Sequence, residues 1–139
     1  DGNLRKKYIN LIKNLKLENK VILPGRAGNI QDFYNKSDIF VLSSKYEGFP
    51  NVLLEAMSNG LPVISTNCKT GPSDIINHYQ NGILISLENF EIELFNEIKK
   101  LIIDHTLREK LSNESIKVKD TFSILNIHLQ WENLFKKKA

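Results

Sequence analysis

Short apolar runs alternate with amphipathic stretches along the first two thirds of the chain. The runs hold three or four mostly apolar residues, which is typical of strands covered on both faces, and the connections between them have crossover length. The pattern predicts strands at 21–23, 39–42, 63–65 and 83–85, and helices near 3–17, 29–36, 51–59 and 72–78. We therefore expect an α/β fold in which helices wrap both faces of a parallel sheet.

From Phe90 onward the apolar spacing is that of helices alone. Apolar residues three and four apart form a stripe in each successive segment. The last stripe contains Trp131, Leu134 and Phe135. We expect these segments to form a helical extension at the end of the chain.

The composition is that of a soluble globular protein. The 139 residues suit one domain, and 41% of them are hydrophobic and 25% charged. No apolar run reaches the roughly 18 residues that cross a bilayer. Basic residues exceed acidic ones by three and are dispersed apart from 136–138, which argues against a nucleic-acid partner.

The cysteine and histidine content restricts which disulfides and metal sites this chain can form. Cys68 is the single cysteine, which excludes an internal disulfide and fits a reducing compartment such as the cytoplasm. The three histidines, His78, His105 and His128, have no Cys or Glu at metal-ligand spacing, so we expect no metal site. The chain starts at Asp1 without methionine or signal peptide and enters a helical pattern at once, as expected for a piece of a longer protein.

Three loops that follow predicted strands are candidate walls of a ligand site, because ligands of open parallel sheets bind beyond the carboxyl ends of the strands. The first loop contains Gly25 and Arg26. Its glycines allow close backbone approach, and the guanidinium can stack on a base or pair with phosphate. A tight turn capped by Asn29 explains the same residues without a ligand, and both interpretations stay open.

The second loop carries the most specific signal. Gly48 and Pro50 force a sharp turn into a helix whose first amides, at 51–53, lack intrahelical acceptors and attract phosphate. The Glu55 side chain leans back toward this helix end, so Glu47 and Glu55 bracket one anion site. A carboxylate beside a diphosphate is best used to accept hydrogen bonds from vicinal ribose hydroxyls.

Plainer explanations exist for both carboxylates. Glu55 stabilises the helix dipole by ~0.3–1 kcal/mol whether or not a ligand binds. Glu47 is explained equally well as a solvated loop residue that binds no ligand. The two glutamates therefore do not identify a site unless the rest of the motif is considered.

The third loop, at 66–74, repeats the arrangement. Gly71 and Pro72 open another predicted helix toward the same rim, so two helix N-termini are expected to converge on one anion. Lys69 either neutralises phosphate there or is solvated. Cys68 has no histidine within a few residues, and we do not expect it to act as a nucleophile.

The run from Ser44 to Met57, S-K-Y-E-G-F-P-N-V-L-L-E-A-M, closely resembles the signature of the family 4 retaining glycosyltransferases, two glutamates separated by seven residues. The similarity continues through 37–41, 60–66, 71–76 and 81–85 and so covers nearly the whole chain. It implies the Rossmann-like C-terminal half of a two-domain GT-B enzyme. Residues 1–139 are then a single nucleotide-sugar-binding domain, truncated at its N-terminus and without the acceptor-binding domain.

The resemblance also implies a role for individual residues. Glu55 binds the ribose hydroxyls, the backbone around Val52 and Leu53 holds the diphosphate, and Glu47 faces the donor sugar as the catalytic residue. The loop at 25–26 frames the base. The full donor-binding set that it implies is Gly25, Arg26, Glu47, Gly48, Phe49, Pro50, Asn51, Val52, Leu53 and Glu55.

The implied reaction is transfer of a hexosyl group from a nucleotide diphosphate sugar, with a UDP-sugar favoured, to a glycan, lipid-linked or polysaccharide acceptor with retention. Such enzymes need neither metal nor cofactor, because helix dipoles and basic side chains stabilise the departing diphosphate. The loop at 67–74 resembles the version in bacterial enzymes of polysaccharide biosynthesis. Peripheral membrane association of the full enzyme is part of the same expectation.

The chain departs from the family pattern in two respects. The family's first strand, with a Gly-Arg…Lys segment that clamps the diphosphate, is not found, and Lys45 and Lys69 replace it only weakly. Asp74 stands where the family often has glutamate, which leaves its role open.

In whole enzymes of this kind the last helix crosses to the partner domain, so we expect Trp131 and its apolar neighbours to be only partly covered.

Two other functional classes of protein remain as alternatives. A non-catalytic nucleotide-binding or scaffold module of the same fold would keep Glu55 and lose transfer. A flavodoxin-like or receiver-type regulatory domain would also alternate strands with helices, but a receiver needs an aspartate cluster at its first strand end. Titration with uridine and guanosine diphosphates separates a nucleotide-binding domain from one that binds none.

We predict that this polypeptide alone transfers no sugar, because the diphosphate clamp and the acceptor domain are not part of it. A transfer assay with nucleotide sugars and the purified chain checks this. Measurable turnover would contradict the prediction.

Overall fold

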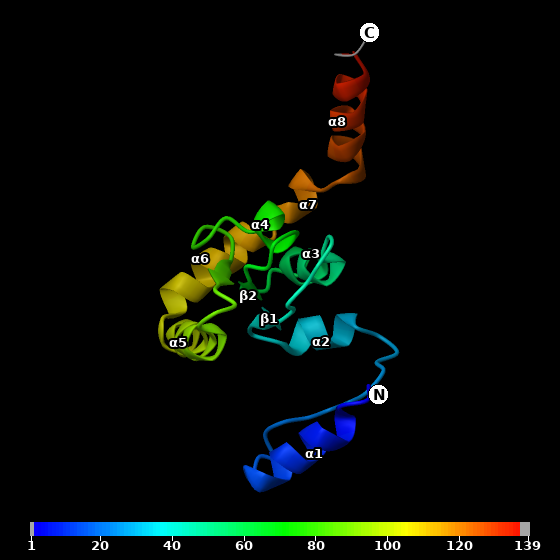
Figure 1. The fold of residues 1–139 in the computed structure, drawn as a ribbon. Helices are drawn as coiled ribbons and strands as arrows, with labels where there is room; N and C mark the ends of the chain where they lie inside the picture. The colour runs from blue at the N-terminus through cyan, green and yellow to red at the C-terminus, as the bar shows by residue number, and fades with distance from the viewer. Residues whose placement is uncertain (1, 137–139) are drawn as a thin grey trace. The chain divides into compact units, whose positions relative to one another are not determined.

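The computed structural model describes residues 2–136, and its elements are shown in Figure 1. The chain divides into two compact units between Phe33 and Tyr34, and each unit is described by itself. Within the described residues, the first unit holds α1 (Arg5–Asn14) and most of its remaining chain is irregular. Helix α2 (Gln31–Lys36) spans the boundary between the two units.

The predicted strand at 21–23 is wrong, because this segment uses its backbone groups in other ways. The amides of Lys20 and Val21 both donate to the carbonyl of Leu17 in a turn, and the Arg5 guanidinium donates to the carbonyl of Leu23 at 2.7 Å. A strand needs a neighbouring ladder, and Ile22 is 80% exposed instead. The first helix is also shorter than predicted, because Lys16 has a left-handed φ of 55°.

The second unit is built on three short parallel strands. They are β1 (Phe40–Leu42), β2 (Val63–Thr66) and β3 (Ile83–Ile85), in the order β1-β2-β3. Val41 lies opposite Ile64 in the first pair, and Ile64 lies opposite Ile83 in the second. These three strands match their predicted positions within one residue, and their parallel pairing confirms the expected sheet.

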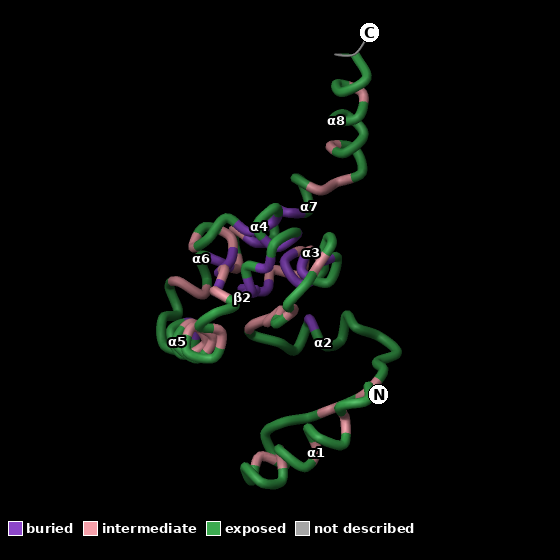
Figure 2. The backbone as a smooth tube through the Cα atoms, viewed as in Figure 1, coloured by how far each residue is buried: buried purple, intermediate pink, exposed green. Residues whose placement is uncertain are grey.

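Helices cover both faces of this sheet. Successive strand residues point to opposite faces, so Val63 enters one cluster of buried residues and Ile64 enters the other. The first cluster includes Leu53 and Met57 of α3 (Asn51–Ser58), and the second includes residues of α5 (Phe90–Ile103) and α6 (His105–Ser115). Figure 2 shows the buried positions concentrated around β2. The expected α/β class is therefore confirmed.

Helix α4 (Pro72–Ile75) has four residues and is shorter than the predicted 72–78. Ile76 is extended, with φ −97° and ψ 120°, and the chain enters a turn that Asn81 closes. The Asn81 side chain accepts from the Asn77 amide at 2.8 Å and donates to the carbonyl of Ile75. These side-chain bonds compete with helical ones and end the helix.

The helical end of the chain is confirmed. After α5 and α6 come α7 (Val118–Thr121) and α8 (Ile124–Lys136). Asp104 caps α6 by accepting from the Leu107 amide at 2.9 Å. Lys137 and Lys138, the rest of the basic run, lie outside the described residues.

Helix α8 leaves an apolar stripe uncovered, as expected. Trp131 is 56%, Leu134 47% and Phe135 64% exposed, and the Trp131 and Phe135 rings stack at 5.9 Å. Ile124 and Ile127 continue the stripe at helical spacing. Figure 2 shows only exposed and intermediate positions along this helix. Exposed apolar stripes of this kind associate with other apolar surfaces.

We predict that the chain self-associates through this stripe. Sedimentation velocity should show association that rises with concentration and that the double variant Trp131→Gln, Leu134→Gln removes. Leu125→Gln is the matched control, because Leu125 is 67% exposed but lies off the stripe. A strictly monomeric native chain would contradict the prediction.

Candidate functional site

The two most informative loops lie at the same edge of the sheet. Residues 43–50 follow β1 and residues 67–71 follow β2, and these two strands are paired in parallel with Leu42 opposite Ser65. Their carboxyl ends therefore meet at one edge, where ligands of open parallel sheets bind. The sequence-predicted residues Glu47 to Leu53 lie on the first of these loops and on the helix that it enters.

Hydroxyl groups hold the two loops together. The buried Thr66 hydroxyl donates to the carbonyl of Ser44 at 2.5 Å, and the Thr70 hydroxyl donates to the carbonyl of Glu47 at 2.6 Å. Gly71 adopts φ +95°, and a Cβ atom there would lie 2.6 Å from the carbonyl oxygen of Gly48. Only glycine fits both the conformation and the space. The path of the first loop is thus set by the second.

This arrangement leaves the side chain of Glu47 available. Glu47 is half-buried, its carbonyl is bound to Thr70, and no hydrogen bond or ion pair to its carboxylate is found among residues 2–136. Phe49 is 48% exposed and packs against Phe122 with ring centroids 5.8 Å apart. Pro50 is buried at the end of the loop. The loop therefore presents the Glu47 carboxylate on a backbone that is bonded to the loop after β2.

The start of α3 offers fewer open amides than the sequence suggested. The Leu53 amide donates to the carbonyl of Pro50 at 3.0 Å, and the Leu54 amide approaches the same oxygen at 3.4 Å. Leu53 itself is fully buried. The amides without a protein acceptor at this end, within the described part of the chain, are those of Asn51 and Val52. The prediction of open amides at 51–53 is thus wrong for Leu53, because the first turn of the helix tightens.

Glu55 lies one turn into α3 and has a partner that sequence reasoning missed. The hydroxyl of Tyr34, at the end of α2, donates to Oε2 of Glu55 at 3.0 Å. Burial and, next, the bond to Glu55 and its negative charge raise the pKa of Tyr34 from 10.0 to about 12, so this hydroxyl stays a donor. The available signal was a tyrosine on the inward side of a short helix, because a buried tyrosine hydroxyl needs an acceptor.

The third loop does not provide the second helix N-terminus that we expected to converge on the anion. The Asp74 carboxylate accepts from the Gly71 amide at 3.3 Å, and the Asp74 amide donates to the Gly71 carbonyl. Asp74 therefore caps its own single-turn helix and occupies the amide that an anion would need. Cys68 is buried, with Sγ 3.5 Å from the carbonyl of Thr70, while Lys69 is exposed.

Gly25 and Arg26 belong to the first unit, whereas Glu47 and Glu55 belong to the second. Gly25 has φ +78°, which explains the glycine by the turn alone, and the Arg26 side chain is exposed. A role of this loop beside the base stays a prediction.

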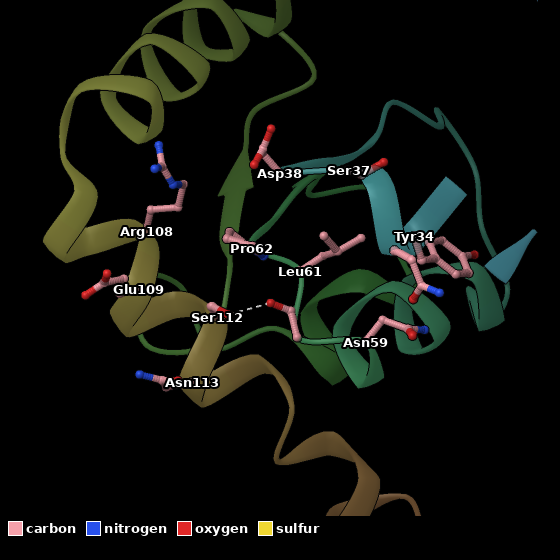
Figure 3. Close-up of a pocket in the computed structure, with 12 residues that line it drawn as sticks. Tyr34, Ser37, Asp38, Asn59, Leu61, Pro62, Arg108, Glu109, Ser112 and Asn113 are labelled. Atoms are coloured by element: carbon pink, nitrogen blue, oxygen red, sulfur yellow. Dashed lines mark hydrogen bonds between the residues drawn. The ribbon is translucent and has the colours of Figure 1, made fainter. Parts of the chain in front are cut away.

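Two hollows flank the sheet at opposite edges. One, of about 460 Å³, lies at the carboxyl edge between Ser43 and Lys45 of the first loop and residues 87–92 around the start of α5. A larger one, of about 710 Å³, lies at the amino edge, and Figure 3 shows Tyr34 and Ser37 on one side of it and residues of α6 on the other. The larger hollow is not beside the Glu47 loop. Loops and helix starts converge at the carboxyl edge, which is where ligands of open parallel sheets bind.

The histidines take part in local structure. His78 Nδ1 accepts from the Leu84 amide at 3.0 Å, His105 lies 2.5 Å from the Arg108 guanidinium, and His128 lies 3.2 Å from Glu132. Within residues 2–136, no three His, Cys, Asp or Glu side chains gather into a metal-binding group. No helix in the described part of the chain has the length and apolarity needed to cross a membrane.

The chain is similar to known proteins over most of its length. The protein-family model of the glycosyl transferases group 1 matches residues 1–118. An uncharacterised glycosyltransferase of Methanocaldococcus jannaschii is 37% identical, over 98% of this chain and 40% of the relative. N-acetylgalactosamine-N,N′-diacetylbacillosaminyl-diphospho-undecaprenol 4-alpha-N-acetylgalactosaminyltransferase of Campylobacter jejuni is 32% identical, over 83% of this chain and 31% of the relative.

Solved structures of TarM match with a TM-score of 0.85 and 29% identity, over 96% of this chain and 27% of theirs. One is a complex of a mutant of S. aureus TarM with fondaparinux, alpha-GlcNAc-glycerol and UDP. This similarity agrees with the expected fold of a GT-B glycosyltransferase half. The chain spans 40% or less of the length of each of these three proteins.

We predict that Gly71→Ala lowers the free energy of unfolding by about 2–4 kcal/mol, because positive-φ strain and a backbone clash add together. Urea denaturation measures the loss. Gly28→Ala is the matched control, since a Cβ there meets nothing within 4 Å. Equal stability of the two variants would show that the loops are not held in this contact.

Proposed function

This chain belongs to the glycosyl transferases group 1 family, and we propose that it binds the nucleotide diphosphate sugar of a retaining, family 4 glycosyltransferase at the carboxyl edge of its sheet. One observation carries the proposal. Glu47 lies on a loop whose backbone is held by Thr66, Thr70 and Gly71, and Glu55 lies one turn into the helix that this loop enters. The donors of a site fixed in this way need not rearrange when charge develops on the leaving group.

In this proposal the start of α3 holds the diphosphate. The amides of Asn51 and Val52 and the positive end of the helix dipole provide donors for its oxygens. Leu53 contributes packing, since its amide is already bound to Pro50. As the bond from the sugar to the diphosphate breaks, the departing oxygen takes the electron pair, and these donors stabilise the resulting negative charge.

The two carboxylates recognise hydroxyl groups on either side of the diphosphate. Glu55 accepts hydrogen bonds from the ribose, and Glu47 faces the donor sugar with the backbone of Gly48, Phe49 and Pro50. A carboxylate only accepts hydrogen bonds, which suits groups rich in hydroxyls. Gly25 and Arg26 frame the base in the same proposal, with the guanidinium as the stacking or phosphate-pairing group.

The relatives support a UDP-sugar donor and a large hydroxyl acceptor. The S. aureus TarM complex contains UDP, and the C. jejuni relative is named for transfer to a diphospho-undecaprenol-linked sugar. We propose the same classes here, namely transfer of a hexosyl group with retention to a glycan, polysaccharide or lipid-linked acceptor. The acceptor is then held by a part of the longer protein that these residues do not include.

We predict that Glu55→Gln weakens binding of UDP by about 10-fold, which corresponds to about 1.4 kcal/mol for one charge-assisted hydrogen bond. Isothermal titration of the chain with UDP measures the change. Glu109→Gln is the matched control, because Glu109 is exposed and lines the amino-edge hollow. A loss of affinity in Glu109→Gln with none in Glu55→Gln would place the ligand at the wrong edge and overturn the proposal.

A further inference from the structure

We propose that Tyr34 is a positioning residue for Glu55, and that the pair makes the chain select ribonucleoside diphosphates over deoxyribonucleoside diphosphates. The Tyr34 hydroxyl holds Oε2 of Glu55, so that Oε1 is turned to a ribose hydroxyl. This inference rests on the proposed function and adds to it the residue that orients the ribose contact.

The two side chains differ sharply in exposure. Tyr34 is 5% exposed and belongs to the buried cluster that also contains Leu53 and Met57 of α3, whereas Glu55 is exposed. The Tyr34 ring also meets Phe40 of β1 edge-on, with centroids 6.1 Å apart. Tyr34 is therefore fixed by the core, and it presents its hydroxyl to a carboxylate that would otherwise move freely.

An exposed glutamate loses side-chain entropy when a ligand immobilises it. The 3.0 Å bond from Tyr34 restricts Glu55 before the ligand arrives. Preorganisation of this kind strengthens binding because less order is imposed at association. A carboxylate has lone pairs on both oxygens, so the bond to Oε2 leaves Oε1 able to accept a hydroxyl.

Protonation favours the same arrangement. The Tyr34 hydroxyl stays neutral because burial and the Glu55 charge raise its pKa to about 12. It therefore donates to the carboxylate throughout the neutral range. A neutral tyrosine also leaves the charge of Glu55 uncancelled, unlike a lysine or arginine at the same place.

A purely structural bond is the competing explanation, since any buried tyrosine hydroxyl needs an acceptor. The chain offers an internal comparison. Tyr79 donates to Oε2 of Glu97 at 2.7 Å, on the loop between β2 and β3, where no donor-binding residue is proposed. Tyr79→Phe thus removes a tyrosine–glutamate bond away from the proposed site, together with the bond that this hydroxyl accepts from Lys100 at 2.6 Å.

The test titrates native chain, Tyr34→Phe and Tyr79→Phe with UDP and with its 2′-deoxy and 3′-deoxy analogues. We expect the native chain to prefer UDP over at least one analogue by about 10-fold, the value of one charge-assisted hydrogen bond. Tyr34→Phe should lower UDP affinity by about 3- to 10-fold and leave affinity for that analogue nearly unchanged. Tyr79→Phe should keep the native preference.

Glu55→Asp provides a second route to the same answer. The shorter side chain keeps the charge but withdraws from Tyr34, so it should also lose the preference for UDP, and adding Tyr34→Phe to it should change nothing more. Thermal unfolding of every variant verifies that it is folded, and the Phe ring keeps the packing against Phe40.

Equal losses for UDP and for the analogues in Tyr34→Phe would mean a structural role only and would overturn this inference while leaving the proposed function intact. Unchanged affinity for UDP in Tyr34→Phe would also overturn this inference and leave the proposed function intact. Failure of the native chain to bind UDP at all would instead overturn the proposed function, and the role of Tyr34 with it.

Discussion

The close approach of Gly71 to the backbone of Gly48 is the constraint on which the proposed site depends. Parallel pairing of β1 with β2 brings two loops to one edge, but pairing alone does not fix how the loops run. The glycine contact and the hydroxyls of Thr66 and Thr70 do, because they join one loop to the other at three points. The backbone of the loop that carries Glu47 is therefore tied to the end of β2 and to the loop that follows it.

This constraint explains why small and hydroxyl-bearing residues stand at the end of β2 and on the loop that follows it. A larger residue at 71 would push the first loop away, and a valine in place of Thr66 would leave the carbonyl of Ser44 without its donor. The catalytic proposal places the chemistry on Glu47 and Glu55. The supporting residues hold the backbone of the loop that carries Glu47, and the amides of Asn51 and Val52 at the helix start keep no protein acceptor within the described residues.

The sequence predicted most of the sheet and the position of the motif on it. Strands at 40–42 and 83–85 are continuous apolar runs and the strand at 63–66 begins with one, and Gly48 and Pro50 correctly predicted the start of α3 at Asn51. Local periodicity could not predict pairing, so the apolar run at 21–23 was misjudged although its backbone is used by a turn and by Arg5. The Tyr34–Glu55 bond joins residues 21 positions apart, and no spacing rule brings such residues together.

Strand β2 places fully buried side chains in both clusters, Val63 on one face and Ile64 on the other. Detachment of either layer of helices would expose a fully buried side chain of β2, Val63 on one face or Ile64 on the other. The sheet and its two layers therefore open as one cooperative unit, and the amides of β2 are expected to be the slowest in the chain to exchange with solvent deuterium.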